Sequence, residues 1–166
     1  MTHVHWRYEV RATDQAAVRK LVAATGFFSP DEEDVAVELV EETLAKGSDA
    51  SGYEFVLADD TENTGQILGY TCFGPVPATV SSYDLYWIAV KPGLQRAGLG
   101  RKLIRESERR AIARGATRMF VDTSGREQYT PTRAFYERMG YREEGRLRDF
   151  YAPGDDKVIY ARDLAA

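Results

Sequence analysis

The segment IAVKPGLQRAGLGR, at positions 88–101, has the composition of a loop that binds phosphate groups. Gly98 and Gly100 have no side chain, so a ligand could approach the backbone closely at both. The first N–H groups of a following helix are unpaired, and the helix dipole favours an anion by roughly 0.3–1 kcal/mol. Because Arg96 and Lys102 add positive charge, the segment predicts a pyrophosphate site. A plain strand–helix turn explains the two glycines equally well, and neither a Walker P-loop nor a dinucleotide fingerprint is present.

Two carboxylates stand in segments that are otherwise apolar and could accept a proton. Asp84 is the only ionisable residue between Tyr83 and Val90. A buried carboxylate must be paired or functional, because unpaired burial costs several kcal/mol. Asp122 ends an apolar stretch at the sheet end where sites gather in open α/β folds. Either acid could serve as a general base. The alternatives are that Asp84 bonds a nearby loop, and that Asp122 is a helix or loop cap, which is the favoured interpretation for Asp122.

Tyr136 is a candidate general acid in the predicted helix that opens at Thr130-Pro131 and ends at Gly140. Phe135 and Met139 are four residues apart and should face the core together. Tyr136 lies beside that face, so we expect a half-buried ring with a free hydroxyl. The alternative is a tyrosine that only contributes to packing.

Several aromatic residues and one arginine could form a pocket for a substrate. Arg126 follows a predicted strand and could hold a substrate carboxylate in a bidentate pair, although a solvated arginine is the plainer interpretation. Core packing is the alternative for each aromatic residue. The aromatic candidates are Tyr86, Trp87, Tyr129, Phe150 and Tyr151.

The pattern of apolar residues and turn signals predicts an α/β fold in the order β-αα-βββ-α-β-α-ββ. The sheet should be mixed, with helices on both faces. We expect a first strand over Val4–Arg11 and a helix from Ser29, which can cap it, to about Lys46. The inward residues of that helix should be Val35, Leu39, Val40 and Leu44. The helix that follows the glycine loop should turn Leu103, Ile104, Ser107 and Ala111 inward.

These motifs resemble the GNAT acetyltransferase superfamily. Gln95-x-x-Gly98-x-Gly100 is similar to its motif A, whose amides bind the pyrophosphate of coenzyme A. The resemblance covers nearly the whole chain and implies the GNAT fold, with a mostly antiparallel sheet. It also implies that acetyl-CoA is the cosubstrate. The implied cofactor contacts are Ile88, Ala89 and Val90 for the pantetheine, and Gln95, Arg96, Ala97, Gly98, Leu99, Gly100 and Arg101 for the pyrophosphate.

The resemblance also assigns roles to the proton-transfer candidates. Tyr136 matches the tyrosine that many members use to protonate the departing thiolate. Asp84 stands eleven residues before Gln95, the spacing of the catalytic glutamate in histone-type members, and Asp122 matches a carboxylate region of some N-terminal acetyltransferases. Residues 148–156 resemble the acceptor loop of the ribosomal-protein-alanine type. Many members carry Asn where this chain has Tyr129-Thr130-Pro131, which weakens the local coenzyme A contact only.

Bulk composition narrows the class of protein. The 166 residues fit one domain over 1–166. A net charge of −4 disfavours nucleic-acid binding, and a single cysteine, Cys72, excludes an internal disulfide. His3 and His5 lack partners for a metal site, so no metal is expected. The polar start of the chain and the absence of an apolar run of ~18 residues predict a cytoplasmic protein that does not bind a membrane. Monomer and homodimer stay open.

The predicted function is transfer of acetyl from acetyl-CoA to a primary amine, by direct attack in a ternary complex. The chain amide near Ile88 would polarise the thioester carbonyl. The acceptor is expected to be a small amine or amino acid. One alternative is a protein N-terminus or lysine; another, of a different class, is an acyl-CoA sensor without turnover.

Overall fold

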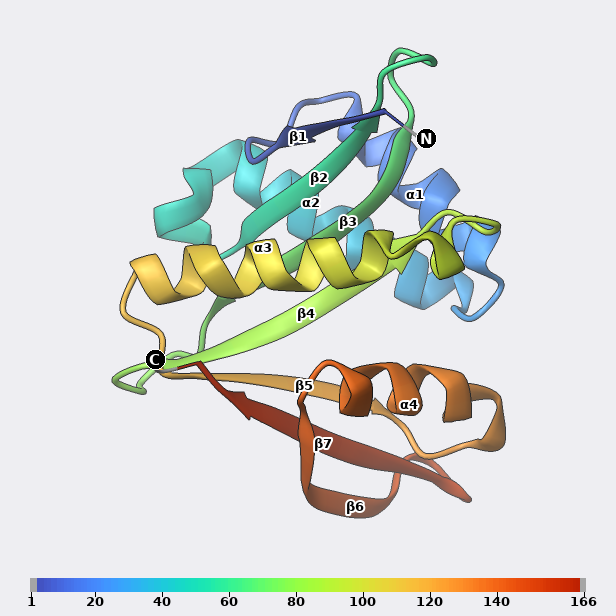
Figure 1. The fold of residues 1–166 in the computed structure, drawn as a ribbon, viewed down its shortest axis with the longest axis vertical. Helices are drawn as coiled ribbons and strands as arrows, with labels where there is room; N and C mark the ends of the chain where they lie inside the picture. The colour runs from blue at the N-terminus through green and yellow to red at the C-terminus, as the bar shows by residue number, and fades with distance from the viewer. Residues whose placement is uncertain (1–2, 165–166) are drawn as a thin grey trace. The chain divides into compact units, whose positions relative to one another are not determined.

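The computed structural model describes residues 3–164, which form two compact units. Among the described residues, the N-terminal unit consists of 3–74 and 87–110, and the C-terminal unit of 75–86 and 111–164. The elements follow in the order β1 (Val4–Arg7), α1 (Asp14–Thr25), α2 (Pro30–Ser51), β2 (Glu54–Asp60), β3 (Ile67–Pro75), β4 (Ser82–Val90), α3 (Leu99–Ala113), β5 (Arg118–Ser124), α4 (Thr130–Arg138), β6 (Arg142–Ala152) and β7 (Asp155–Asp163) (Figure 1).

Hydrogen bonds join the strands into a mixed sheet in the order β1-β2-β3-β4-β5-β7-β6. The β4–β5 pair is parallel, whereas β1–β2, β2–β3, β5–β7 and β6–β7 are antiparallel. The predicted fold class is therefore confirmed.

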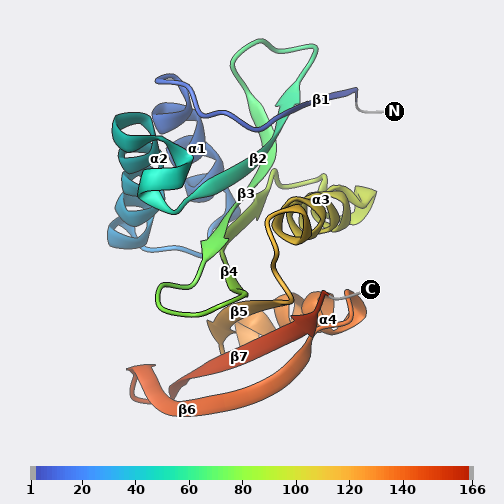
Figure 2. The same ribbon diagram turned by 90° about the vertical axis from the view of Figure 1, so that its left-hand side faces the viewer.

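In the N-terminal unit, helices cover both faces of the strands (Figure 2). Alternate side chains of β2 and β3, such as Phe55 and Tyr70, join residues of α1 and α2 in one buried cluster. On the other face, Thr71 shares a buried hydrogen bond with Ser107 of α3. Each strand therefore buries both faces, as in the interior of an α/β sheet. Cys72 lies in the buried cluster as a packing residue, as predicted.

The first strand ends at Arg7 and not at the predicted Arg11, because Arg7 turns into a buried ion-pair cluster. Its guanidinium donates to Asp14 of α1 at 2.7 and 2.9 Å and to Asp59 of β2 at 2.8 Å. Asp14 also accepts from the Arg11 amide at 2.6 Å. Burial opposes the charge on Arg7, but the bonds to the two carboxylates prevail and raise its pKa. This cluster ties β1, α1 and β2 together.

Helix α2 begins as predicted but presents a partly different face to the core. The side chain of Ser29 accepts from the Glu32 amide, and the reciprocal bond completes a capping box. The helix continues past Lys46 to Ser51, with a kink at Gly47 where φ is 79°. Val40 is buried and Leu39 packs against the core, as predicted, but Val35 and Leu44 are 45% and 38% exposed, and Ala36, Val37 and Thr43 are buried in their place. The inward stripe thus follows Ala36, Val40 and Thr43 at the i, i+4, i+7 spacing.

Gly69 of β3 lies close to both α3 and the backbone of β4. A Cβ at this position would lie 2.9 Å from Leu103 Cδ1 and 3.0 Å from the Ala89 carbonyl oxygen. We expect Gly69→Ala to lower the free energy of unfolding by about 1–3 kcal/mol, because the helix must shift to admit the methyl group. Gly145→Ala is the matched control, since its nearest neighbour would be Ile159 Cδ1 at 4.0 Å. Urea unfolding of both variants measures the difference, and equal midpoints would contradict the tight contact.

Candidate active site

The glycine loop joins β4 to α3 in the N-terminal unit. The strand ends in Val90, a 3₁₀ turn covers Gln95–Ala97, and Gly98 adopts φ +79° before α3 begins at Leu99. Gly100 already lies in the first turn of the helix, so the loop ends at Gly98. Nothing lies within 4 Å of the position that a Cβ would take at Gly98. The first amides of α3 lack intrahelical partners, so the loop can receive an anion.

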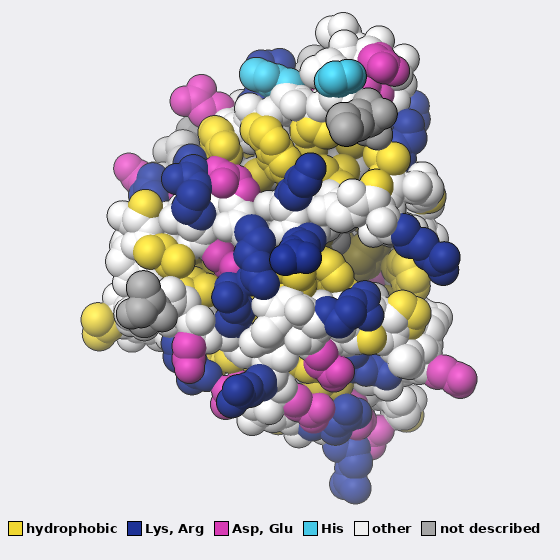
Figure 3. Space-filling model, viewed as in Figure 1, with side chains coloured by type: hydrophobic (Ala, Val, Ile, Leu, Met, Phe, Trp, Pro, Cys, Tyr) yellow, Lys and Arg dark blue, Asp and Glu magenta, His cyan; other side chains and the backbone are white. Residues whose placement is uncertain are grey.

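Basic side chains concentrate on α3 and the turn before it, and their pairing differs along the helix (Figure 3). Arg105 and Arg109 are paired with Glu108 at 2.8 Å and Glu106 at 2.6 Å. Near the loop, by contrast, Arg96, Arg101 and Lys102 are exposed and form no ion pair with any residue of 3–164. The uncompensated positive charge thus lies at the loop end of the helix, where the dipole also attracts an anion.

In the C-terminal unit, Asp84 marks the end of the parallel β4–β5 ladder. The ladder comprises the pairs Ser82–Arg118, Tyr83–Met119 and Asp84–Phe120. Side chains alternate along a strand, so Asp84 shares a face with Phe120 and Asp122. The neighbouring Tyr83, Met119 and Val121 are buried on the opposite face. Asp84 is half-buried and lies on the face of the strands opposite to these buried residues.

Asp122 forms an ion pair with Lys157 of β7. The Nζ–Oδ2 distance is 2.9 Å, and the Lys157 ammonium also lies 4.7 Å from the centre of the Phe150 ring. Within residues 3–164 this ion pair is the interaction of the Asp122 carboxylate, which does not cap the following loop as predicted. The hydroxyl of Ser124 donates to Asp155 and not to Asp122. Burial and then the charge of Asp122 raise the pKa of Asp84, which Lys157 partly offsets. Asp84, Asp122 and Lys157 therefore form one electrostatic group on neighbouring strands.

Tyr136 lies in α4 against the opposite face of the same strands. It is 4% exposed, so the expected half-buried ring is wrong. The register of α4 turns Tyr136 and Met139 inward, with Phe135 beside them, and the ring contacts Tyr141 and Tyr160 at centroid distances of 6.0 and 6.1 Å. Its hydroxyl has no hydrogen-bond partner among residues 3–164. Burial raises the pKa of Tyr136, which keeps the phenol protonated at neutral pH.

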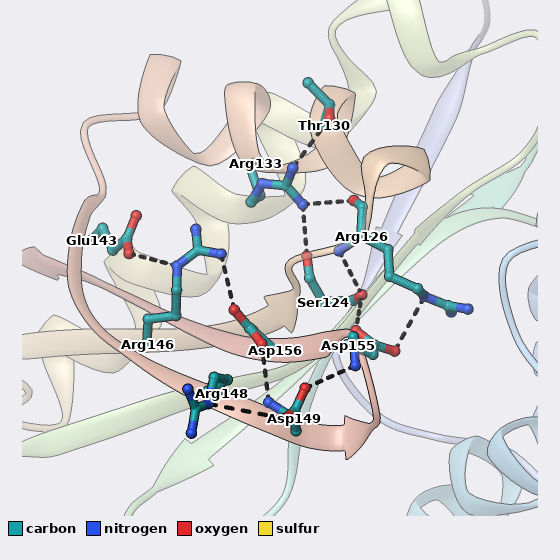
Figure 4. Close-up of polar contacts among 11 residues, drawn as sticks. Ser124, Arg126, Thr130, Arg133, Glu143, Arg146, Arg148, Asp149, Asp155 and Asp156 are labelled. Carbon is teal, nitrogen blue, oxygen red and sulfur yellow. Dashed lines mark hydrogen bonds and ion pairs between the residues drawn. The ribbon is translucent and has the colours of Figure 1, made fainter.

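Arg126, the predicted carboxylate clamp, is already paired inside the C-terminal unit (Figure 4). Its Nε lies 3.1 Å from Asp155 Oδ2, and Asp155 is 7% exposed. Ser124 donates to the same carboxylate and accepts from the Arg126 amide at 3.1 Å. Arg133 of α4 holds the loop from the other side, donating to the carbonyl oxygens of Ser124 and Arg126 at 2.7 and 2.9 Å. A substrate carboxylate would therefore have to compete with Asp155 for Arg126.

The aromatic residues predicted to line a pocket come from both units of the chain. Trp87 packs on Phe28 in the N-terminal unit, with ring centroids 4.8 Å apart. Tyr129 lies under Arg126, 5.8 Å from its guanidinium carbon. Tyr86, Phe150 and Tyr151 are 36%, 53% and 49% exposed in the C-terminal unit. Phe150 contacts the charged group through Lys157 and packs edge-on against Tyr151, with ring centroids 5.1 Å apart.

Comparisons with known proteins identify the family of this chain. A family model described as the Acetyltransferase (GNAT) family matches residues 16–141. The chain belongs to the GNAT family. A Desulfovibrio desulfuricans protein assigned to the GNAT family as an acetyltransferase is 47% identical, over 98% of this chain and 100% of that chain, with a TM-score of 0.93.

More distant GNAT structures share the fold. An aminoglycoside 6'-N-acetyltransferase complexed with coenzyme A is 16% identical, over 96% of this chain and 98% of that chain, with a TM-score of 0.73. The ribosomal-protein-S18-alanine N-acetyltransferase of Escherichia coli is 20% identical, over 98% and 96%, with a TM-score of 0.72. No curated protein matches the chain. As a GNAT protein, the chain is an acetyl-CoA-dependent N-acetyltransferase.

Two residues of this GNAT chain gained significance only from the structure. Lys157 pairs with the candidate base Asp122, and Asp155 neutralises Arg126. Both lie in β7, far along the sequence from their partners, and a lone Lys or Asp in a polar stretch carries no signal of its own. Within residues 3–164, no group of three or more His, Cys, Asp and Glu side chains could hold a metal ion, and no helix is long and apolar enough to cross a membrane.

Proposed function

We propose that this acetyltransferase transfers acetyl to a small primary amine, with Asp84 as general base and Tyr136 as general acid. The observation that carries the proposal is the position of both residues at one level of the C-terminal sheet, on opposite faces. Asp84 pairs with Phe120, the last β5 residue of the parallel ladder. Tyr136 contacts Tyr160, whose partner on β5 is Val121, the residue directly after Phe120. A thioester placed at the end of the ladder would have one group on each side.

Asp84 suits the role of base because the acceptor amine must lose a proton. A lysine-type amine has a pKa near 10.4, so only about one molecule in two thousand is neutral at pH 7. Burial and the Asp122 charge raise the pKa of Asp84 and so bring it closer to neutral pH. A general base is most effective when its pKa lies near the working pH. If the carboxylate is too short to reach the amine, a water molecule can relay the proton.

The glycine loop suits coenzyme A because its charge is uncompensated. Arg96, Arg101 and the amides that open α3 would hold the pyrophosphate, and the backbone of Ile88–Val90 would pair with the pantetheine arm. Coenzyme A supplies the acetyl group as an activated thioester. Gln95, Ala97, Gly98, Leu99 and Gly100 would contribute backbone contacts.

The proposed reaction balances without an acyl-enzyme. The amine nitrogen forms a bond to the carbonyl carbon while the carbon–sulfur bond breaks. Asp84 accepts the proton from the amine, and the Tyr136 hydroxyl donates a proton to the departing sulfur. The Ile88 amide would stabilise the carbonyl oxygen as charge develops. Proton exchange with solvent restores both side chains for the next turnover.

An assay of CoA release from acetyl-CoA tests the proposal across amino acids, polyamines, aminoglycosides and short peptides. Turnover on a class of small amines supports it. Turnover confined to peptides would favour the protein N-terminus or lysine alternative. Tight acetyl-CoA binding without turnover on any amine would favour a sensor and would contradict the catalytic roles of Asp84 and Tyr136.

We expect Tyr136→Phe to lower kcat at least about tenfold, because the general acid is lost while the ring remains. The affinity for acetyl-CoA should change little, since the hydroxyl acts only on the departing sulfur. Steady-state kinetics and calorimetry measure the two quantities. Tyr160→Phe is the matched control, because it removes a hydroxyl from the same aromatic cluster, one that donates to Glu137 at 3.2 Å. Wild-type kcat in Tyr136→Phe would remove Tyr136 from the mechanism.

A further inference from the structure

We propose that the acceptor carries a second positive charge, separated from the reacting amine by a short aliphatic chain. This inference rests on the proposed function and names the substrate class for the face of the C-terminal sheet that bears Asp84. We call this surface the acidic face. It consists of Asp84, Tyr86, Phe120, Asp122, Leu147, Phe150, Lys157 and Ile159.

The strand register places these residues on one side of the sheet. Asp122 pairs with Ile159 across the β5–β7 ladder, and Leu147 pairs with Lys157 across the β6–β7 ladder. Directly paired residues point to the same side, and residues two apart on one strand do so as well. Phe150 joins the group through its contact with Lys157. The opposite side holds α4 and the buried Tyr160 and Val158.

The exposed part of the acidic face combines apolar surface with carboxylates. Leu147 and Phe150 are 45% and 53% exposed, and the Asp122 side chain is 42% exposed. Two carboxylates share the face with two cations, Lys157 and Arg118, but Arg118, which lies over the Phe120 ring, is paired with Glu144 and Asp163. The Asp84 carboxylate has no ion pair within residues 3–164. The face therefore has an excess negative charge beside exposed apolar side chains. A cation with a hydrocarbon stem complements both features.

Lys157 shows how an ammonium fits on this face. Its Nζ lies 2.9 Å from the Asp122 carboxylate and 4.7 Å from the centre of the Phe150 ring. A carboxylate together with the face of an aromatic ring is the pair of groups that binds ammonium ions in proteins. With the reacting amine at Asp84, a distal ammonium would share Asp122 with Lys157.

The cations of the neighbouring loop are poorly placed to select a carboxylate. Arg126 is paired with the buried Asp155, and Arg133 donates to Ser124, Arg126 and Thr130 oxygens. An acceptor with a carboxylate near its amine would meet the like charges of Asp84 and Asp122, and it would have to share Arg126 with Asp155. A diamine or polyamine is therefore favoured as the acceptor over an amino acid, which the sequence analysis had also allowed.

Three ligands with a four-carbon chain test the inference: 1,4-diaminobutane, butylamine and 4-aminobutanoate. Their distal groups are cationic, neutral and anionic. We expect kcat/KM to fall in that order, by at least about tenfold between the diamine and butylamine. Asp122→Asn should bring the ratio of kcat/KM between the diamine and butylamine close to one. Asp163→Asn, a carboxylate at the exposed end of β7, is the control and should keep the preference.

Binding to the CoA-loaded protein, measured by calorimetry, separates this inference from the proposed function. If the diamine binds more tightly than butylamine but no acetyl transfer occurs, the acidic face recognises the second charge and the catalytic proposal fails. If the three ligands bind equally, or 4-aminobutanoate binds most tightly, the second-charge inference is overturned even where acetyl transfer is observed.

Discussion

Asp84→Asn should lower kcat/KM by about 10²–10⁴-fold and erase the acid limb of its pH profile. Asparagine has the same shape as aspartate but cannot accept the amine proton. In the wild type, activity should rise with pH as Asp84 loses its proton. Burial and the Asp122 charge raise the Asp84 pKa, so the midpoint of that limb should lie above the ordinary range of an aspartate. Initial rates across pH at low amine concentration measure the profile.

Asp122→Asn is the control for this experiment. Loss of the Asp122 charge lowers the pKa of Asp84, and Lys157, released from its partner, lowers it further. The acid limb should therefore survive and shift to lower pH, in an assay with butylamine, which lacks a distal charge. If Asp84→Asn keeps an acid limb with the wild-type midpoint, Asp84 is not the base and Asp122 becomes the candidate.

Gly98→Glu should raise the Kd for acetyl-CoA by roughly a hundredfold or more, because it places a carboxylate where the pyrophosphate would bind. The space beside Gly98 is open, so the new side chain could occupy it without displacing another residue. The amides that open α3 and the unpaired Arg96 and Arg101 would then face an internal negative charge. Calorimetric titration with acetyl-CoA measures the effect.

Gly65→Glu controls for backbone strain and for net charge. Gly65 adopts φ +86°, close to the +79° of Gly98, and also has open space around it, but it lies in the turn between β2 and β3. Any residue other than glycine is strained at both positions. Equal loss of acetyl-CoA affinity in the two variants would indicate general destabilisation, and unchanged affinity in Gly98→Glu would contradict the pyrophosphate assignment.

Local sequence patterns predicted the helices and strands well where an element has a single apolar face to bury. Leu103, Ile104, Ser107 and Ala111 of α3 were predicted to face inward, and all four are 0% exposed. The capping box at Ser29 and the left-handed Gly140 also follow from short-range rules. The inward face of α2 was predicted only in part. Leu39 and Val40 face the core but Val35 and Leu44 do not, because packing against α1 and β2 selects between two apolar stripes.

The candidate site also has a part that the sequence predicts and a part that it does not. The glycine loop, the lone acid of β4 and the tyrosine of α4 are recognisable in sequence, because each depends on residue types at short spacing within one segment. The charged partners of the site residues cannot be recognised in the sequence. Lys157 meets Asp122, and Asp155 meets Arg126, only because β7 lies beside β5 in the sheet.

The amino-acid sequence by itself determined the family, the sheet with its helices and the candidate groups for acetyl transfer. The tertiary structure decided which face of the sheet each group occupies and which charges remain uncompensated. The physical reason is that secondary structure and motifs arise from interactions between residues near one another in the chain, whereas the pairing of charges depends on strand register between distant segments. Arg126 therefore changed from a free clamp to a paired side chain, and the acidic face came to favour a cationic acceptor.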